Sequence, residues 1–209
     1  SPKIISTLMV LTVLPAAYAI VIYLGDAVYS TAHRLYFTRL MEYGGLAAAP
    51  LMIVIMISLV RGKRSPIGLL PVRAALLCSI VLFSAGGLLG FMIEGINVVI
   101  PAHYHGSIVG VTLAFMGLTY FLLPRLGFGR PEGRMAHWQP YIYGGGQLMH
   151  ITGLAWSGGY GVQRKTAGAA QGLENLPEIA GMALMGMGGL VAIIGGILFL
   201  VVAINAMRR

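Results

Sequence analysis

The stretch IPAHYHGSIVGVTLAFMGLTYFLLPRLG, residues 100–127, decides the fold class of this chain. It places two histidines one residue apart at the start of a run that is otherwise almost entirely apolar. A helix rises about 1.5 Å per residue, so a run of this length crosses the ~30 Å hydrocarbon core of a bilayer. The stretch therefore predicts a membrane-spanning helix that carries His103 and His105 near one end.

The whole chain has the composition of an integral membrane protein. Of its 209 residues, 57% are hydrophobic and 10% are charged, and the mean hydropathy is +0.84. The net charge of +8 comes from basic residues between apolar runs, which favours membrane topology over nucleic-acid binding. The single cysteine, Cys78, excludes disulfides within the chain and thiolate metal clusters.

Six apolar runs are long enough to cross a membrane as helices. The connections between them are too short to bury a core of their own, so the sequence predicts one all-α transmembrane domain over residues 1–209. Glycine is abundant, with 30 residues, and small residues allow close approach of helix backbones or of a flat cofactor. The predicted spans lie at about 4–24, 44–61, 67–93, 101–124, 139–158 and 180–206.

The basic residues predict the orientation of these spans. Ten of the fourteen fall on the side that holds both termini, and an excess of lysine and arginine marks the cytoplasmic side. The sequence therefore predicts two cytoplasmic termini. The four basic residues on the opposite side are Arg34, Arg39, Arg164 and Lys165.

The spacing of the two histidines sets a geometric limit on what they bind. Residues two apart on a helix point about 200° from each other, so His103 and His105 project from nearly opposite faces and do not chelate one metal. Each imidazole at membrane depth needs a partner. A haem iron on each side would supply one, and so would backbone or headgroup hydrogen bonds, so the spacing alone leaves both open.

Three segments in order resemble subunit I of the haem-copper oxidase superfamily, over its helices seven to twelve. They are SIVLFSAGGLLGFMIEGINVV (residues 79–99), the stretch quoted above, and HITGLAWSGGYGVQRKTAG (residues 150–168). The tenth helix of that family opens with an A-H-x-H motif similar to residues 102–105. HRLYFTRLMEYGG, residues 33–45, resembles the start of the eighth helix less sharply.

This resemblance implies a role for five residues. His103 would bind the iron of the high-spin haem, His105 would bind the iron of the low-spin haem, and Tyr104 would lie between the two haems. The family has a basic pair near the haem propionates after its eleventh helix, and Arg164 and Lys165 occupy the corresponding loop.

The chain also departs from the family pattern. Two adjacent histidines after the seventh helix normally bind the second metal, but VIYLGDAVYSTAHR, residues 21–34, contains only His33. This argues against a complete copper centre. The segment that corresponds to the family's eighth helix lacks the threonine and lysine of one proton path. The loop before the tenth helix lacks the family's His-Asp pair, which is linked to a magnesium site, and Glu94 is the nearest acid there. His137 is interpreted as an interfacial anchor and His150 as a packing residue.

The resemblance implies a split subunit of a respiratory terminal reductase, which is part of an oxidoreductase complex and inactive as an isolated chain. It would supply ligands for electron transfer from a low-spin haem to a high-spin haem that reduces O2. Three alternatives stay open: a nitric oxide reductase-like subunit, a haem-bearing electron-transfer or assembly subunit without copper, and a scaffold or transporter without haem.

The implied cofactors are two haems of unspecified type, shared with a partner chain. The implied partners are a second chain with the N-terminal helices, further oxidase subunits, the lipid bilayer, and cytochrome c, a cupredoxin or a quinol as electron donor. No nucleic-acid partner is expected. The implied location is a prokaryotic cytoplasmic (inner) membrane.

Overall fold

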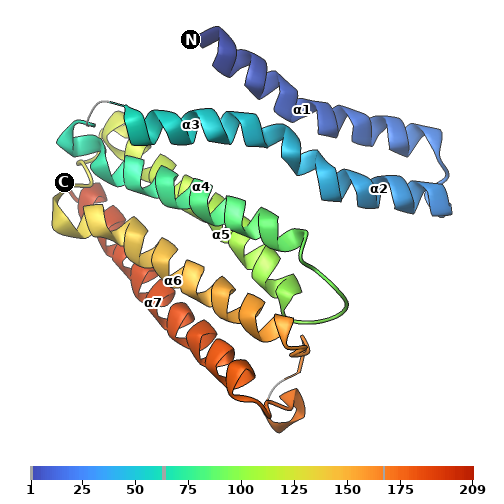
Figure 1. Cartoon of the computed structure of the whole chain (residues 1–209). Coiled ribbons are helices and arrows are strands. Elements are labelled where there is room, and N and C mark those ends of the chain that lie inside the picture. Colours follow the sequence, from blue (N-terminus) through green and yellow to red (C-terminus); the bar gives the residue numbers. More distant parts are fainter. Residues whose placement is uncertain (1, 63–64, 167) are drawn as a thin grey trace. The chain divides into compact units, whose positions relative to one another are not determined.

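The computed structural model describes residues 2–62, 65–166 and 168–209 (Figure 1). The elements in these ranges are helices, and no β-strand occurs among the described residues, which confirms the predicted all-α class. The chain separates into two compact units, residues 1–62 and 63–209, and each is described by itself. The single transmembrane domain expected from the sequence stays a prediction.

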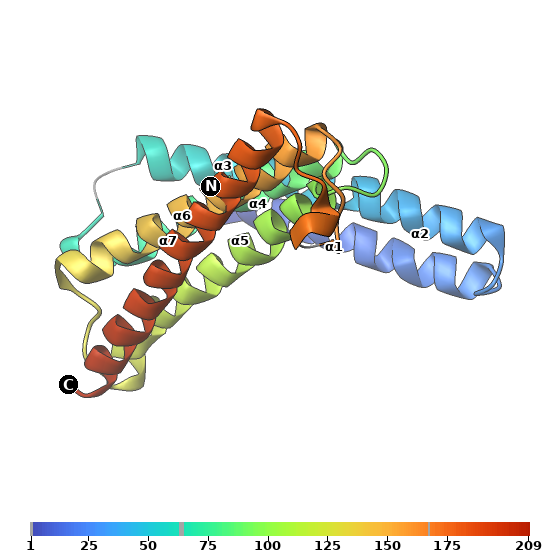
Figure 2. The ribbon, with the colours of Figure 1, turned by 90° about the horizontal axis from the view of Figure 1, so that it is seen from below.

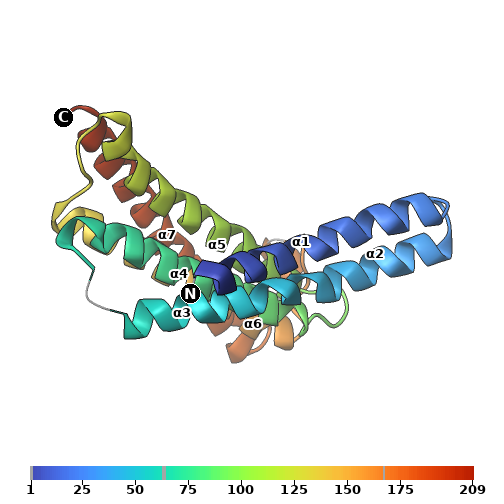
Figure 3. The ribbon, with the colours of Figure 1, turned by 90° about the horizontal axis from the view of Figure 1, so that it is seen from above.

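The first unit is a helical hairpin. Helix α1 (Pro2–Gly25) is joined by a short turn to α2 (Thr31–Tyr43), and the two lie side by side (Figure 3). From α2 the chain passes through the 3-10 helix η1 (Gly44–Ala48) into α3 (Ala49–Arg61), and both η1 and α3 contact α1. The first predicted span, residues 4–24, therefore forms a helix as expected.

The expectation of a plain connection over residues 25–43 is wrong for most of that segment. The chain is helical from Thr31 through to Arg61, so the predicted span at 44–61 is the later part of a longer helical segment. Ser30 starts this segment, because its Oγ accepts a hydrogen bond from the backbone N–H of His33 at 3.0 Å. Hydropathy missed α2 because charged side chains lower the apolarity of a segment without preventing a helix.

The second unit is built from two antiparallel helix pairs. Helix α4 packs along α5, α6 packs along α7, and α6 also contacts both α4 and α5 (Figure 1). The elements of this unit are η2 (Ile67–Leu69), α4 (Leu70–Gly90), α5 (Val99–Leu122), η3 (Leu123–Leu126), α6 (Gly133–Gly159), η4 (Gly168–Gln171) and α7 (Leu176–Met207).

Glycines let the paired helices approach closely. A Cβ built on Gly86 of α4 would lie 2.6 Å from the carbonyl carbon of Gly106 on α5. A Cβ built on Gly195 of α7 would lie 2.5 Å from the Cα of Tyr143 on α6. Since backbone atoms cannot withdraw as the end of a side chain can, no larger residue fits at these positions without separating the helices. Helix packing therefore explains these glycines.

Hydrogen bonds tie both ends of α7 to neighbouring segments. At its end, the backbone N–H of Gly129 donates to the carbonyl of Ala206 at 2.9 Å, which holds the connection after η3 beside α7 (Figure 2). At its start, the Glu178 carboxylate and Asn175 form a capping box, and the Ser157 hydroxyl of α6 donates to the Glu178 carbonyl at 3.1 Å. These bonds tie α7 to α6 and to the connection that precedes it.

A buried glutamine links three helices in the core of the second unit. Gln139 of α6 is fully buried; its Oε1 accepts from the Tyr120 hydroxyl of α5 at 3.0 Å, and its Nε2 donates to the Gly195 carbonyl of α7 at 3.1 Å. A buried amide without partners is costly, so these bonds make the polar side chain compatible with an apolar surrounding. The three helices are therefore held in one register.

Replacing Tyr120 with phenylalanine is expected to destabilise the second unit by about 1 kcal/mol, because Gln139 Oε1 then stays buried without its donor. The change corresponds to a lower Tm by about 2–4 °C for a chain of this size. Thermal unfolding in detergent measures it. Tyr160→Phe is the matched control, since Tyr160 is exposed at the end of α6 and should leave the Tm unchanged.

Five helical segments of the described chain are long and apolar enough to cross a membrane, and many of their large apolar side chains are exposed. Residues 139–158 lie within α6, as predicted, but this helix is not among the five because polar residues such as Gln139 and Gln147 interrupt it. The chain is therefore described as a membrane protein, and six spans with cytoplasmic termini remain a prediction. The five segments are Lys3–Gly25, Thr31–Arg61, Ile67–Gly90, Val99–Leu126 and Leu176–Met207.

Candidate functional site

Three of the predicted site residues, His103, Tyr104 and His105, lie at the start of α5. Just before the helix, Oδ1 of Asn97 accepts a hydrogen bond from the Val99 backbone N–H at 3.0 Å, which satisfies one of the free N–H groups of the first turn. Pro101 follows in the first turn, where the missing N–H of proline costs no helical hydrogen bond. This local sequence places His103 and His105 in the first two turns of an otherwise apolar helix.

His103 contacts α4. Its Nδ1 lies 2.7 Å from the carbonyl oxygen of Gly86, and a carbonyl only accepts, so Nδ1 carries the proton. In the neutral ring this leaves a lone pair on Nε2, which is the arrangement that metal-binding histidines use. Gly90 completes the contact, because a Cβ at that position would lie 2.8 Å from Nδ1 of the ring. Gly90 thus makes room for the ring, and the backbone carbonyl of Gly86 fixes its tautomer.

His105 faces a different helix. Its ring centroid lies 5.0 Å from that of His150 on α6, with the two rings close to perpendicular, and 5.0 Å from that of Tyr104. Neither ring nitrogen of His105 makes a hydrogen bond to any residue within the described ranges. His103 and His105 therefore contact two different helices, α4 and α6, which also pack against each other.

His150 is held in the same way as His103. Its Nδ1 lies 3.0 Å from the carbonyl oxygen of Met185 on α7, so the neutral ring keeps its lone pair on Nε2. The interpretation of His150 as a hydrogen-bonded packing residue agrees with this bond. Its closeness to His105 was not expected from the sequence, because the residue spacing does not reveal which faces of two helices meet.

Arg164 and Lys165 lie in the loop after α6, at the same end of the unit as the two histidines. The backbone N–H of Val98, just before α5, donates to the Val162 carbonyl at 3.0 Å, and this bond joins the loop to the start of α5. Arg164 is half-buried, and its Nε is buried without a hydrogen-bond partner among the described residues. Lys165 is exposed and has a φ of 62°, a region that non-glycine residues rarely adopt.

Tyr104 is exposed at 41%, and its ring lies beside that of His105. Gln147 was not predicted as a site residue. Its Oε1 is buried without a partner among the described residues, and it precedes His150 by about one helical turn. A glutamine within a predicted membrane span is the signal that marks such a position.

The remaining histidines lie apart from this group along the chain. His33 packs within the first unit, where its Nδ1 lies 3.2 Å from the Asp26 carbonyl. His137 stands near the start of α6 with its ring edge-on to Trp138 and Tyr141. In the described part of the chain, no three His, Cys, Asp or Glu side chains gather where they could hold a metal ion together.

The histidines of this site are suited to bind iron one nitrogen at a time, and they are not arranged to surround one metal ion together. Each of the two helix-facing imidazoles, His103 and His105, offers one nitrogen on a different side of α5. The orphaned Nε of Arg164 is a buried donor that lacks an anionic acceptor, and a carboxylate such as a haem propionate would satisfy it. Single imidazole nitrogens and a buried guanidinium are the kinds of group that a haem iron and a haem propionate would require.

Comparison with known proteins finds no protein family that matches this chain. An uncharacterized protein of Rickettsia prowazekii (strain Madrid E) is 40% identical over 139 residues, which cover 61% of this chain and 27% of that protein. An uncharacterized protein of Aquifex aeolicus (strain VF5) is 33% identical over 92 residues, which cover 44% of this chain and 23% of that protein. The chain thus spans about a quarter of the length of these curated relatives.

Proposed function

We propose that this chain supplies the two-haem helix of a respiratory terminal reductase of the haem-copper type. His103 would hold the high-spin haem iron, His105 the low-spin haem iron, and electrons would pass from the second to the first for reduction of O2. The observation that carries the proposal is the orientation of His103, whose Nδ1 bond to Gly86 leaves Nε2 available to a metal, while His105 contacts a different helix, α6.

The remaining residues of the site would position the cofactors. Arg164 and Lys165 would bind propionates, since guanidinium and ammonium groups form strong charge-assisted hydrogen bonds to carboxylates. Tyr104 would lie between the two haems. Redox chemistry belongs to the bound haem when it is present, and the protein contributes axial ligands, orientation and local charge.

The enzyme would need more than this chain. The other axial ligand and the missing metal ligands would come from N-terminal helices, located in a partner chain or in the rest of a longer protein, together with further oxidase subunits. Cytochrome c, a cupredoxin or a quinol would donate electrons. The excess of basic residues on one side would place both termini in the cytoplasm, and the membrane would be the prokaryotic cytoplasmic membrane.

One observation favours a second candidate function. The sequence contains no two adjacent histidines, whereas the family places such a pair beside the high-spin haem. A haem-bearing electron-transfer or assembly subunit without copper would have the two-haem helix but would not need the pair of adjacent histidines. Nitric oxide is the alternative substrate if the second metal is present.

Optical spectroscopy on the purified full-length protein tests the proposal. Reduced-minus-oxidised spectra, recorded with and without carbon monoxide, are expected to reveal two haems, one of which binds carbon monoxide. Copper in a parallel metal analysis would support the haem-copper reductase, and iron without copper would support the electron-transfer subunit. A protein purified from haem-sufficient cells without haem absorbance would contradict both functions.

A further inference from the structure

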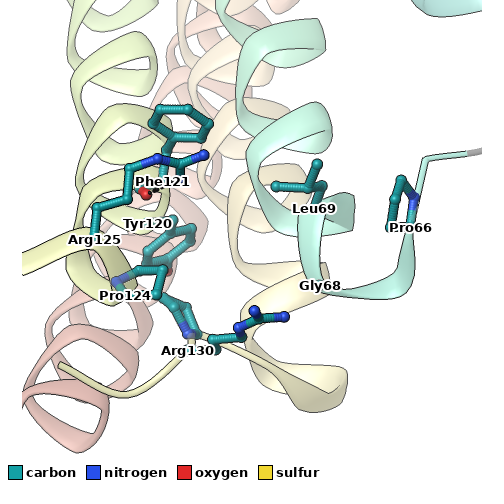
Figure 4. A pocket seen from close by; sticks show the side chains of 9 residues that line it. Pro66, Gly68, Leu69, Tyr120, Phe121, Pro124, Arg125 and Arg130 are labelled. Atoms are coloured by element: carbon teal, nitrogen blue, oxygen red, sulfur yellow. Dashed lines mark hydrogen bonds between the residues drawn. The ribbon is translucent and has the colours of Figure 1, made fainter. Parts of the chain in front are cut away.

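A second site lies at the opposite end of α5 from the histidines. A cavity of about 420 Å3 opens between η2, the end of α5 and the connection that follows η3 (Figure 4). Leu69, Phe121 and Pro124 form apolar walls, and Arg125 and Arg130 supply positive charge. A cavity with apolar walls and positive charge is suited to a ligand that has an apolar part and a negatively charged part.

Arg130 has a guanidinium available for a ligand. In the part of the chain that the structure describes, it makes no hydrogen bond or ion pair. Its Nη1 lies 3.5 Å from the position that a Cβ on Gly68 would occupy, so the Arg130 side chain extends across the cavity toward η2 (Figure 4). An exposed arginine beside a cavity with no carboxylate in its lining is suited to bind an anion.

Arg125 is held in place at the same cavity. Its guanidinium carbon lies 3.4 Å from the centre of the Phe121 ring, and Nη1 donates to the Phe121 carbonyl at 2.7 Å. A guanidinium has about five N–H donors, so this bond leaves most of them for a ligand. The nearest acid along the chain, Glu132, lies 3.7 Å from Arg209 and does not line the cavity.

The position of the cavity along the helices favours one class of ligand. It lies at the ends of Ile67–Gly90 and Val99–Leu126, two of the segments long and apolar enough to cross a membrane. The ends of such helices reach the lipid headgroups, where basic pockets bind phosphate groups of anionic lipids. We propose that this cavity binds the phosphate headgroup of an anionic phospholipid, with Arg125 and Arg130 on the phosphate and the acyl chains along the apolar wall.

This proposal is independent of haem binding, because it uses none of the residues at the start of α5. Free phosphate would use the same two arginines but leave the apolar wall in contact with water. A lipid satisfies both parts of the cavity. Free phosphate and a phospholipid headgroup share the phosphate anion, so an experiment must distinguish between these two ligands.

Native mass spectrometry of the full-length protein in detergent micelles tests the proposal. The protein is titrated separately with phosphatidylglycerol, phosphatidylcholine of the same acyl chains, and inorganic phosphate. Phosphatidylglycerol is expected to bind more tightly than phosphatidylcholine. Arg130→Gln should weaken phosphatidylglycerol binding about fivefold, as expected when one cation near an anionic headgroup is lost, and Arg130→Lys should restore part of the affinity.

Arg134→Gln is the matched control, because Arg134 is an exposed arginine near the same end of the unit but does not line the cavity. It should leave binding unchanged, and circular dichroism should be the same for each variant. The proposal is overturned if Arg134→Gln weakens binding as much as Arg130→Gln, if phosphatidylcholine binds equally well, or if inorganic phosphate binds while phosphatidylglycerol does not.

Discussion

Under the proposed function, separate replacement of His103 and His105 by alanine is expected to remove two different haems from the purified protein. Each variant should lose about half of the haem iron, because each imidazole serves a different side of α5. Loss of His103 should abolish the spectral change on carbon monoxide binding, and loss of His105 should remove the low-spin band while the carbon monoxide response remains. Optical difference spectra and iron analysis measure both effects.

His137→Ala is the control for these variants, since His137 stands near the start of α6, far along the chain from His150. Both haems should remain in that variant. His103→Gly with added imidazole adds a test of ligation, because free imidazole should restore the lost haem only if the ring acted through its nitrogen. If His103→Ala and His105→Ala lose the same band, or neither loses haem, the assignment of the two residues is wrong.

Gly86→Ala is expected to destabilise the second unit by about 3 kcal/mol, at the upper end of the range for overpacked positions. The new Cβ would lie 2.6 Å from the carbonyl carbon of Gly106 and 2.9 Å from its Cα, so α4 and α5 must separate. The shift should also move the Gly86 carbonyl away from His103. Thermal unfolding in detergent measures the first effect, and the haem content of the same preparation reports the second.

Gly87→Ala provides the matched control, because a Cβ at that neighbouring position meets no atom within 4 Å. Alanine favours a helix over glycine by up to about 1 kcal/mol, so this variant should be as stable as the parent protein or slightly more stable. If Gly86→Ala and Gly87→Ala lose the same stability, Gly86 acts through backbone flexibility, and close contact between α4 and α5 does not explain why glycine stands there.

Most helix positions could be predicted from hydropathy alone. The predicted spans at 67–93, 101–124 and 180–206 fall on α4, α5 and α7 with ends within a few residues. These helices are long runs of apolar side chains, and such runs are visible without any knowledge of their neighbours. The helix at Thr31–Tyr43 was not predictable this way, because its charged residues conceal it from a hydropathy criterion.

The candidate site was predictable only in part. Helical periodicity predicts that His103 and His105 project in different directions, and in the structure their rings contact different helices, α4 and α6. The approach of His150 to His105 and the orphaned Nε of Arg164 were not predictable, since both depend on how α5, α6 and the loop after α6 pack.

The sequence by itself determined that this is an all-helical chain with membrane-length apolar segments and that two histidines one residue apart face opposite ways. Both properties are local, because they depend on residue type and on the geometry of a single helix. Only the tertiary structure decided that Gly86 fixes the ring of His103 and that Arg125 and Arg130 share a cavity with Leu69. These contacts join residues far apart in the chain, and only helix packing brings them together.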